Sequence, residues 1–283
     1  MDPTEAVLPT SRTFPTPSLL ATLPPLATQT PTPFPSLGEK VSVVFVSDQE
    51  AISVYANPAQ TDAVIAQLAP NQTNIHLSGE IQEIDGQQWV EIQLDGGSKG
   101  WVNAQYLTPA IGADQFCLDE RVQGYTDRIL EIFRLRDGDR LAEIVSPIHG
   151  LRLRTHWSSP EVYLGGSEEV SELFTSSKTF SFGKGRQSQT LIQGTFMDVI
   201  YPLLLDVQDG GVETCNTLEQ GLAADWLSGF IQWPFEYANL NYLARFRPAP
   251  PDNELDWRMW AFGIEWIDQQ PYLTVMVHYQ WDF

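Results

Sequence analysis

The sequence predicts a multidomain chain in which a small all-β barrel is followed by an α+β domain with an antiparallel sheet. Short runs that alternate apolar and polar residues recur from 41 to 108, apolar residues with helical spacing follow from 119 to 135, and two long aromatic runs end the chain. This order of segments is typical of an all-β unit followed by an α+β unit. We therefore expect three parts, at 1–40, 41–110 and 111–283.

Residues 1–40 have the composition of a linker, because proline and threonine are interleaved throughout, as in TPTPFP at 30–35. Proline lacks a backbone donor and disfavours helix at the residue before it. The segment is thus expected to be an extended tether, with a disordered tail of no tethering role as the alternative. No signal peptide or transmembrane segment is evident. We expect an extracytoplasmic chain, tethered to a membrane or wall, with a lipid anchor at the true N-terminus.

Strand signals are strongest from 89 to 107, where WVEIQL alternates with a period of two. Turns are expected at Asp85-Gly86 and at 95–97, because glycine reaches positive φ without steric cost. Residues 62–68 are interpreted as a connecting segment. The expected strands lie at 41–47, 51–55, 74–84, 89–94 and 100–102.

Two motifs in this region resemble the bacterial SH3 (SH3b) domain. One is VIAQL at 64–68 after the turn at 57–58, and the other is GWV at 100–102 followed by YL at 106–107. The resemblance implies an SH3-like barrel that binds a peptide or a cell-wall component such as peptidoglycan, or that positions its neighbour. It also implies a ligand-binding set, with core packing as the alternative for its members. That set is Tyr55, Trp89, Trp101 and Tyr106.

The resemblance has two departures from the family pattern. Tyr55 stands where the family usually has arginine, and Asn57 where it has glycine. The order of tether, SH3-like module and aromatic-ended domain is nevertheless similar to that of bacterial lipoproteins.

The C-terminal part begins with a predicted helix over 119–135 that Asp119 could cap. A second, short helix is expected at 141–145, and a further helix at 195–205, broken or kinked at Pro202. Two long strands, 256–267 and 272–281, form a hairpin in which alternate residues from Leu273 to Trp281 share one face. Trp257 and Trp260 cannot both face one core in a regular strand, so either aromatic surface is exposed or both sheet faces are packed.

Helices followed by strands and a terminal hairpin are similar in order to the cone-shaped NTF2-like (SnoaL-like) fold. That resemblance implies a pocket whose inward polar residues can perform acid–base chemistry. His278 is then a weak candidate for a general base beside Glu265 or Asp256. The alternative is a surface or structural histidine.

Cys117 and Cys215 are the two cysteines, and an even pair in an extracytoplasmic protein favours a disulfide over two buried thiols. Cysteine and histidine show no metal-ligand spacing, so no metal or other cofactor is expected.

The formal charge of −20 excludes nucleic acid as a partner, because an acidic chain repels phosphates. Residues 41–110 hold eight acidic side chains and a single basic one, Lys99. No nucleophile motif is present. We therefore expect a binding or scaffold protein rather than an enzyme, with a small-ligand receptor or enzyme using a C-terminal pocket as the alternative.

Overall fold

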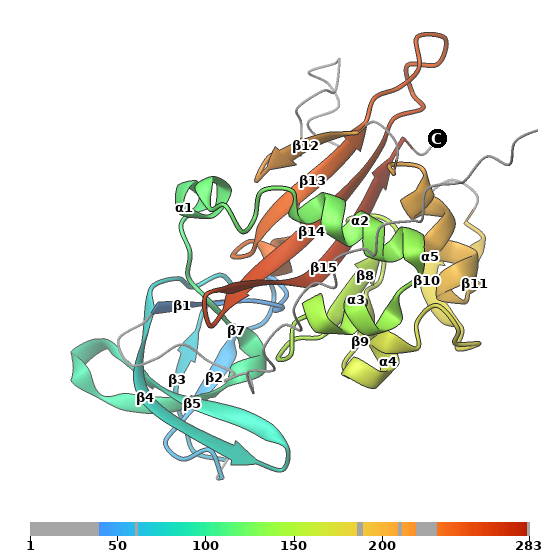
Figure 1. Cartoon of the computed structure of the whole chain (residues 1–283). Helices are drawn as coiled ribbons and strands as arrows, with labels where there is room; N and C mark the ends of the chain where they lie inside the picture. Colours follow the sequence, from blue (N-terminus) through green and yellow to red (C-terminus); the bar gives the residue numbers. More distant parts are fainter. Residues whose placement is uncertain (1–39, 60–61, 186–188, 209–210, 219–230, 282–283) are drawn as a thin grey trace, which may run out of the picture. The chain divides into compact units, whose positions relative to one another are not determined.

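Two sheets, each formed by its own part of the chain, make up most of the structure, and the helices are few (Figure 1). The structure is a computed structural model, and it describes residues 40–281 except 60–61, 186–188, 209–210 and 219–230. The predicted linker, apart from Lys40, lies outside the described residues.

The N-terminal sheet is antiparallel, with strand order β3-β2-β6-β5-β4-β1-β7. It curls around its own core, which includes Val54, Val90 and Val102. Its strands are β1 Lys40–Val43, β2 Ile52–Tyr55, β3 Val64–Leu68, β4 Ile75–Ile84, β5 Gln87–Gln93, β6 Lys99–Asn103 and β7 Leu107–Pro109, with short helical turns η1 Asp95–Gly97 and η2 Ala104–Tyr106.

Local sequence explains most of this sheet. Asp85 and Gly86 both have positive φ, 53° and 74°, which is the geometry of a tight hairpin turn between β4 and β5. Gly100 is required for a different reason. A Cβ atom there would lie 2.4 Å from Val54 Cγ1, so β6 can approach β2 closely only with glycine.

The predicted connecting segment at 62–68 is wrong, because Val64–Leu68 is strand β3, paired with β2. Four of its five residues are at least partly exposed, as expected of an edge strand, so it lacks the alternation of a half-buried strand. The first strand is also shorter than predicted, since it ends at Val43 and Phe45 has a φ of 62°.

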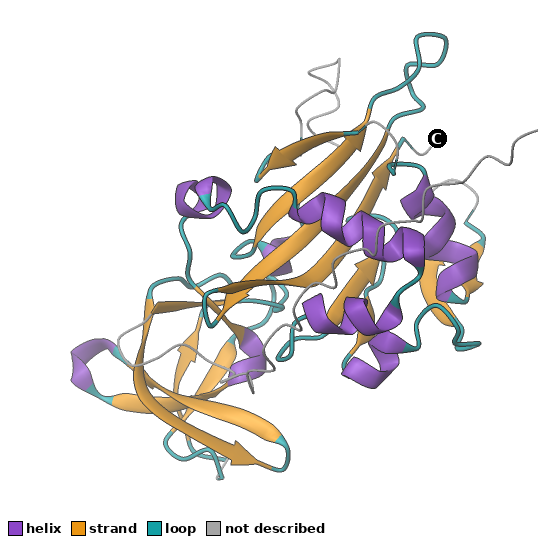
Figure 2. Cartoon of the chain, in the orientation of Figure 1, coloured by secondary structure: helices purple, strands orange, loops and turns teal. Residues whose placement is uncertain are grey.

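Five α-helices are described, and α2 lies against the C-terminal sheet (Figure 2). They are α1 Ala113–Leu118, α2 Tyr125–Leu135, α3 Gly138–Ile144, α4 Ser167–Ser171 and α5 Phe196–Leu205.

The single helix predicted over 119–135 is therefore wrong at its start. Gly124, with a φ of 71°, precedes α2, and the Asp119 carboxylate binds Arg121 rather than capping the helix. The helix predicted at 195–205 is confirmed as α5. Thr195 caps it through a reciprocal pair of bonds with Asp198, and it continues through Pro202.

The C-terminal sheet has the order β12-β13-β14-β15-β8-β9, and all its pairings are antiparallel except β15 with β8. Its strands are β8 Leu151–Arg154, β9 Val162–Leu164, β12 Val212–Cys215, β13 Asn241–Arg247, β14 Arg258–Ile267 and β15 Gln270–Gln280. A separate pair, β10 Phe180–Lys184 and β11 Leu191–Gly194, lies outside this sheet, and Phe235–Tyr237 forms the short turn η4.

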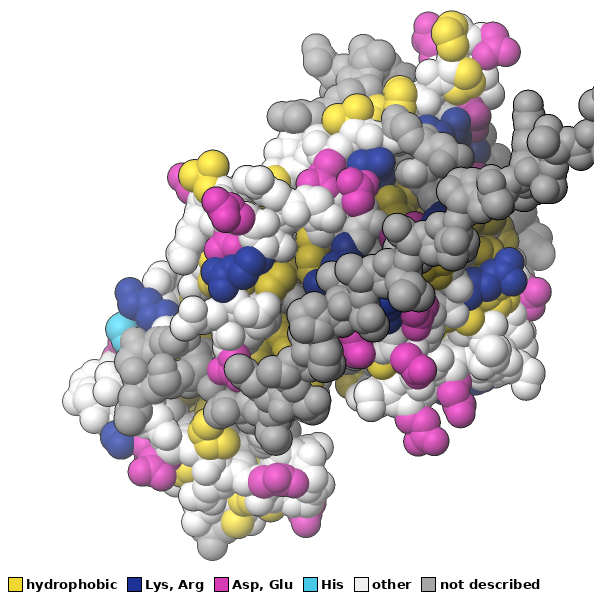
Figure 3. All heavy atoms as spheres, in the orientation of Figure 1, with side chains coloured by type: hydrophobic (Ala, Val, Ile, Leu, Met, Phe, Trp, Pro, Cys, Tyr) yellow, Lys and Arg dark blue, Asp and Glu magenta, His cyan; other side chains and the backbone are white. Residues whose placement is uncertain are grey.

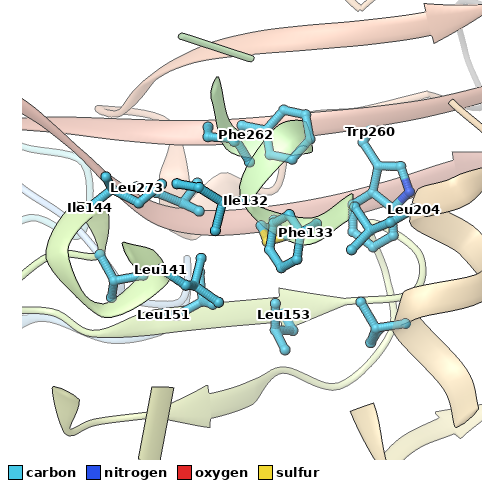
Figure 4. Close-up of a cluster of buried hydrophobic side chains, with 14 of the residues drawn as sticks. Ile132, Phe133, Leu141, Ile144, Leu151, Leu153, Leu204, Trp260, Phe262 and Leu273 are labelled. Carbon is cyan, nitrogen blue, oxygen red and sulfur yellow. The ribbon is translucent and has the colours of Figure 1, made fainter. Parts of the chain in front are cut away.

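Both faces of the C-terminal sheet are buried. Trp260, Phe262 and Leu273 face the helices and pack with Ile132 and Phe133 of α2 (Figure 4). The opposite face forms a second aromatic-rich cluster. That cluster includes Trp257, Met259, Val275, Val277 and Tyr279.

The expectation that Leu273 shares a face with Val275 is wrong. The register between β14 and β15 shifts after Gly263, so Gly263 pairs with Val275 and Ile264 pairs with Leu273. The extra residue in β15 turns Leu273 to the helix side. Trp257 and Trp260 point to opposite faces of the sheet and are 3% and 0% exposed. Of the two alternatives, packing on both faces is therefore confirmed, and an exposed aromatic surface at these residues is not.

The predicted disulfide is present: Cys117 of α1 is bonded to Cys215 of β12. Hydrophobic contacts also join the two sheets. Val44, which follows β1, is fully buried in the cluster on the second face of the C-terminal sheet. In the other direction, Ile148 packs against the core of the N-terminal sheet.

Candidate ligand-binding site

An open polar groove of about 310 Å³ lies where the hairpin of β4 and β5 meets the chain after α3. This volume is at the lower end of the range for small-ligand sites. Four lining side chains are carboxamides, one is a carboxylate, and none of the lining side chains is a cation. The groove, called here the carboxamide groove, is lined by Glu83, Gly86, Gln87, Gln88, Asn103, Ala104, Gln105, Pro147 and Ile148.

Strand register brings the polar side chains of the groove together. Glu83 pairs with Gln88 across the β4–β5 hairpin, and Trp89 pairs with Asn103 across β5 and β6. The tight turn at Asp85 and Gly86 keeps these strand ends adjacent. The groove therefore follows from the hairpin geometry rather than from a single local motif.

Asn103 organises the floor of the groove. The residue is 8% exposed. Its Nδ2 donates to Gln87 Oε1 at 2.8 Å, and its Oδ1 accepts from the Gln105 backbone N–H at 3.0 Å. Because the oxygen of Gln87 accepts this bond, the two N–H donors of Gln87 remain for other partners. A fixed Asn103 thus positions two exposed carboxamide residues, Gln87 and Gln105.

The second wall of the groove comes from a loop at residues 146–150, called here the 146–150 loop. The Ser146 hydroxyl accepts from the backbone N–H groups of Ile148 and His149, at 3.2 and 2.9 Å. Gly150 adopts a φ of 60°, and a Cβ atom there would lie 2.2 Å from the carbonyl oxygen of Leu164. These constraints hold Pro147 and Ile148 against the N-terminal sheet.

His149 fixes the same loop to the C-terminal sheet. Its Nδ1 lies 2.6 Å from Glu265 Oε2, and both side chains are fully buried. The Thr108 hydroxyl, from β7, donates to the same oxygen at 3.5 Å, and the ring of Phe45 packs edge-on against His149. Glu265 is therefore engaged at the junction between the sheets and not with His278, contrary to the expected pairing.

His278 lies in a packed interior. It is fully buried against the ring of Trp260, at 5.0 Å between centroids. Burial lowers its pKa to about 3, a backbone interaction with Thr155 opposes this, and the nearby Arg258 and His156 lower it further. His278 is therefore neutral at pH 7 and surrounded by core side chains, and Asp256 pairs with Arg258 instead. This environment lends no support to a general-base role.

The ligand-binding set predicted from the family resemblance is only partly brought together. Tyr55 pairs with Trp101 across β2 and β6, and the ring of Tyr55 packs edge-on against Trp89 at 5.6 Å. These three side chains share the sheet face opposite the core, next to Gln87 and Asn103. Trp89 and Trp101 are only 7% and 8% exposed. Tyr106 instead packs against the core.

The same face carries one ion pair. Lys99 Nζ lies 2.7 Å from Glu91 Oε2, which also accepts from the Ser78 hydroxyl. Burial raises the pKa of Glu91, but the hydrogen bonds from Lys99 and Ser78 outweigh it, so the pKa is lowered overall. Elsewhere, acidic side chains are dispersed over the face of the molecule drawn in Figure 3.

A second charged cluster lies at the junction between the sheets. Arg152 contacts Glu161 at 3.1 Å, and Arg154 pairs with Glu236, so two cations are matched by two carboxylates. The guanidinium of Arg152 lies over the Phe45 ring, 3.7 Å from its centroid. The Phe45 backbone N–H also donates to the carbonyl oxygen of Glu236 at 2.7 Å, so Phe45 attaches the chain after β1 to this cluster, which indicates a structural role.

Sequence reasoning missed the carboxamide groove. A signal existed in the GQQW and NAQY segments, where carboxamides flank aromatic residues next to a turn. Nothing local identified Pro147 and Ile148 as the opposite wall, because the pairing of His149 with Glu265 spans 116 residues.

Within the described ranges, no helix meets the length and apolarity needed to cross a membrane, and no group of three or more His, Cys, Asp or Glu side chains is arranged to hold a metal ion. No family model, curated protein or solved structure matches the chain.

Proposed function

We propose that the protein is an extracytoplasmic, membrane- or wall-tethered binding protein whose N-terminal sheet, an SH3b-like module, recognises a peptide or a cell-wall component such as peptidoglycan. The carboxamide groove carries this proposal, because it gathers side chains that both donate and accept hydrogen bonds. The disulfide supports an oxidising compartment.

The charge of the N-terminal sheet restricts the classes of ligand that can bind. Apart from Lys40 at the start of β1, Lys99 is the only basic side chain of this sheet, and it is held by Glu91. The groove is lined by Glu83 and by no cation, so a ligand with anionic groups would meet a carboxylate there without a balancing positive charge. The proposed ligand is therefore an uncharged or cationic part of the envelope.

A receptor or enzyme pocket inside the C-terminal domain has less support. Trp260, Phe262 and His278 are fully buried on the helix side of the sheet, where an NTF2-like pocket would open. We assign the C-terminal domain a supporting role, since it supplies the 146–150 loop to the groove.

The proposal is tested by pull-down of the full chain with purified peptidoglycan sacculi. The double variant Gln87→Ala/Gln105→Ala removes two groove carboxamides, and a loss of about 1 kcal/mol for each of two hydrogen bonds predicts binding that is weaker by roughly thirtyfold. Gln93→Ala is the matched control, because Gln93 is an exposed carboxamide on the same strand, β5, but does not line the groove. Failure of the wild-type chain to bind sacculi, or full binding by the double variant, would contradict the proposal.

A further inference from the structure

We infer that the carboxamide groove binds an uncharged sugar, so that the glycan rather than a peptide is the part of the envelope that the protein recognises. The inference rests on the proposed function and specifies its ligand class. It follows from three properties of the groove: its polar groups, its place in the sheet, and its apolar wall.

The polar groups match hydroxyls. A hydroxyl donates one hydrogen bond and accepts others, and a carboxamide offers both functions from adjacent atoms. Gln88 and Gln105 present this pair of functions to one small volume, and Gln87 adds its N–H donors, since its oxygen accepts from Asn103. Glu83 adds an acceptor, and no lining residue is a cation, so carboxylated or sulfated sugars are disfavoured.

The place of the groove in the sheet argues against an extended peptide. Peptides that add to a sheet pair with a free edge strand through their main chain. The edges of the N-terminal sheet are β3 and β7, whereas the sheet residues of the groove come from the β4–β5 hairpin, the end of β6 and the following turn η2. At the groove, Gln87 and Gln88 of β5 pair with the end of β4, and Trp89 pairs with Asn103 of β6, whereas β4 pairs with β1 only at Ile75 and His76, so that its end at Glu83 has β5 as its one neighbour among the described strands. Recognition by the carboxamides of β5 and β6 therefore uses side chains, which suits a compact ligand.

The apolar wall suits the C–H face of a sugar ring. Pro147, Ile148 and Ala104 are the apolar side chains that line the groove. A site that combines a few placed polar groups with apolar contact is typical of small-ligand recognition. The hydrogen bonds that fix Asn103 and Ser146 hold both walls before the ligand arrives.

The test is calorimetric titration of the full chain with three trisaccharides that differ in charge: tri-N-acetylchitotriose (uncharged), chitosan trimer (cationic) and trigalacturonate (anionic). We expect the uncharged sugar to bind and trigalacturonate not to bind. Gln87→Ala should weaken chitotriose binding by roughly tenfold, the effect of about 1.4 kcal/mol, and Gln93→Ala should leave it unchanged. Gln87→Glu, which keeps the size of the side chain, should weaken binding as well.

Competition separates this inference from the proposed function. Sacculi captured through Gln87 and released by chitotriose would support both. Sacculi captured through Gln87 but released only by a free stem peptide, with no sugar binding, would overturn the sugar assignment and leave the binding function standing. Capture of sacculi that is insensitive to Gln87→Ala, or no capture at all, would overturn both.

Discussion

The two sheets differ in how many of their faces are buried. The C-terminal sheet packs helices on one face and an aromatic-rich cluster on the other, so its side chains are committed to stability. The N-terminal sheet has one core, and its second face carries Trp89, Trp101 and the adjoining carboxamides. The comparison indicates where to search for function: both faces of the C-terminal sheet are occupied by packing, and the proposed site lies at the polar end of the N-terminal sheet.

The largest expected effect comes from the disulfide, which stabilises the part of the chain that contains the C-terminal sheet. Replacing both Cys117 and Cys215 by serine should lower the free energy of unfolding by about 4–5 kcal/mol, because the bond closes a loop of 98 residues. Chemical denaturation of the two forms measures the difference. A change below about 1 kcal/mol would show that the helical layer is held by packing alone.

The next effect tests the buried core directly. Trp260→Ala should cost about 3–5 kcal/mol, since Trp260 is fully buried and its Nε1 donates to the Leu203 carbonyl at 2.9 Å. Gln93→Ala, at an exposed site on the N-terminal sheet, should change stability by less than about 0.5 kcal/mol. Equal denaturation midpoints for Trp260→Ala and Gln93→Ala would contradict the view that the C-terminal sheet depends on its buried faces for stability.

His278 gives the same scaffold a pH dependence. The unfolded chain protonates this residue near its ordinary pKa of 6.5, whereas the folded chain binds the proton only near pH 3. Between these pH values the unfolded state binds more protons than the folded state, so the contribution of His278 to the free energy of unfolding falls as the pH falls. We expect the free energy of unfolding to fall by about 2 kcal/mol between pH 7 and pH 5 because of His278, and this fall should be absent in the variant His278→Gln. Parallel curves of unfolding free energy against pH for the two proteins would contradict the assignment.

The smallest effect concerns the loop that joins the two regions. Ser146→Ala removes the acceptor for two backbone N–H groups and should cost about 1 kcal/mol. The same change should weaken binding at the groove, because Pro147 and Ile148 lose their support. Hydrogen exchange at the Ile148 and His149 amides, compared with that at Gln93, shows whether the loosening is local.

The parts of the fold that local sequence predicts are those in which local chemistry and tertiary packing agree. Asp85-Gly86 produced the expected hairpin, and the alternation from Trp89 to Gln93 produced the expected strand. The terminal hairpin is also confirmed, although its turn is shortened to two residues, Asp268 and Gln269.

The errors have tertiary causes. Strand β3 depends on pairing with β2, and the altered facing of Leu273 depends on a bulge that alternation does not reveal. The helix start at Tyr125 is an exception with a local cause, because Gly124 before it adopts a left-handed conformation. The groove was missed for the same reason, since Ile148 reaches it only because His149 is held by a residue far along the chain.

The disulfide also has a mechanical consequence. If the chain is stretched between its two ends, the 98 residues of separation between Cys117 and Cys215 are bypassed by the covalent bond. At roughly 3.4 Å for each extended residue, about 330 Å of contour length is withheld from extension until the bond is reduced. Helices α2 to α5 and strands β8 to β11 all lie within that loop. A force applied through the proline-rich segment would therefore stretch the N-terminal sheet and the terminal hairpin, but not the helical layer.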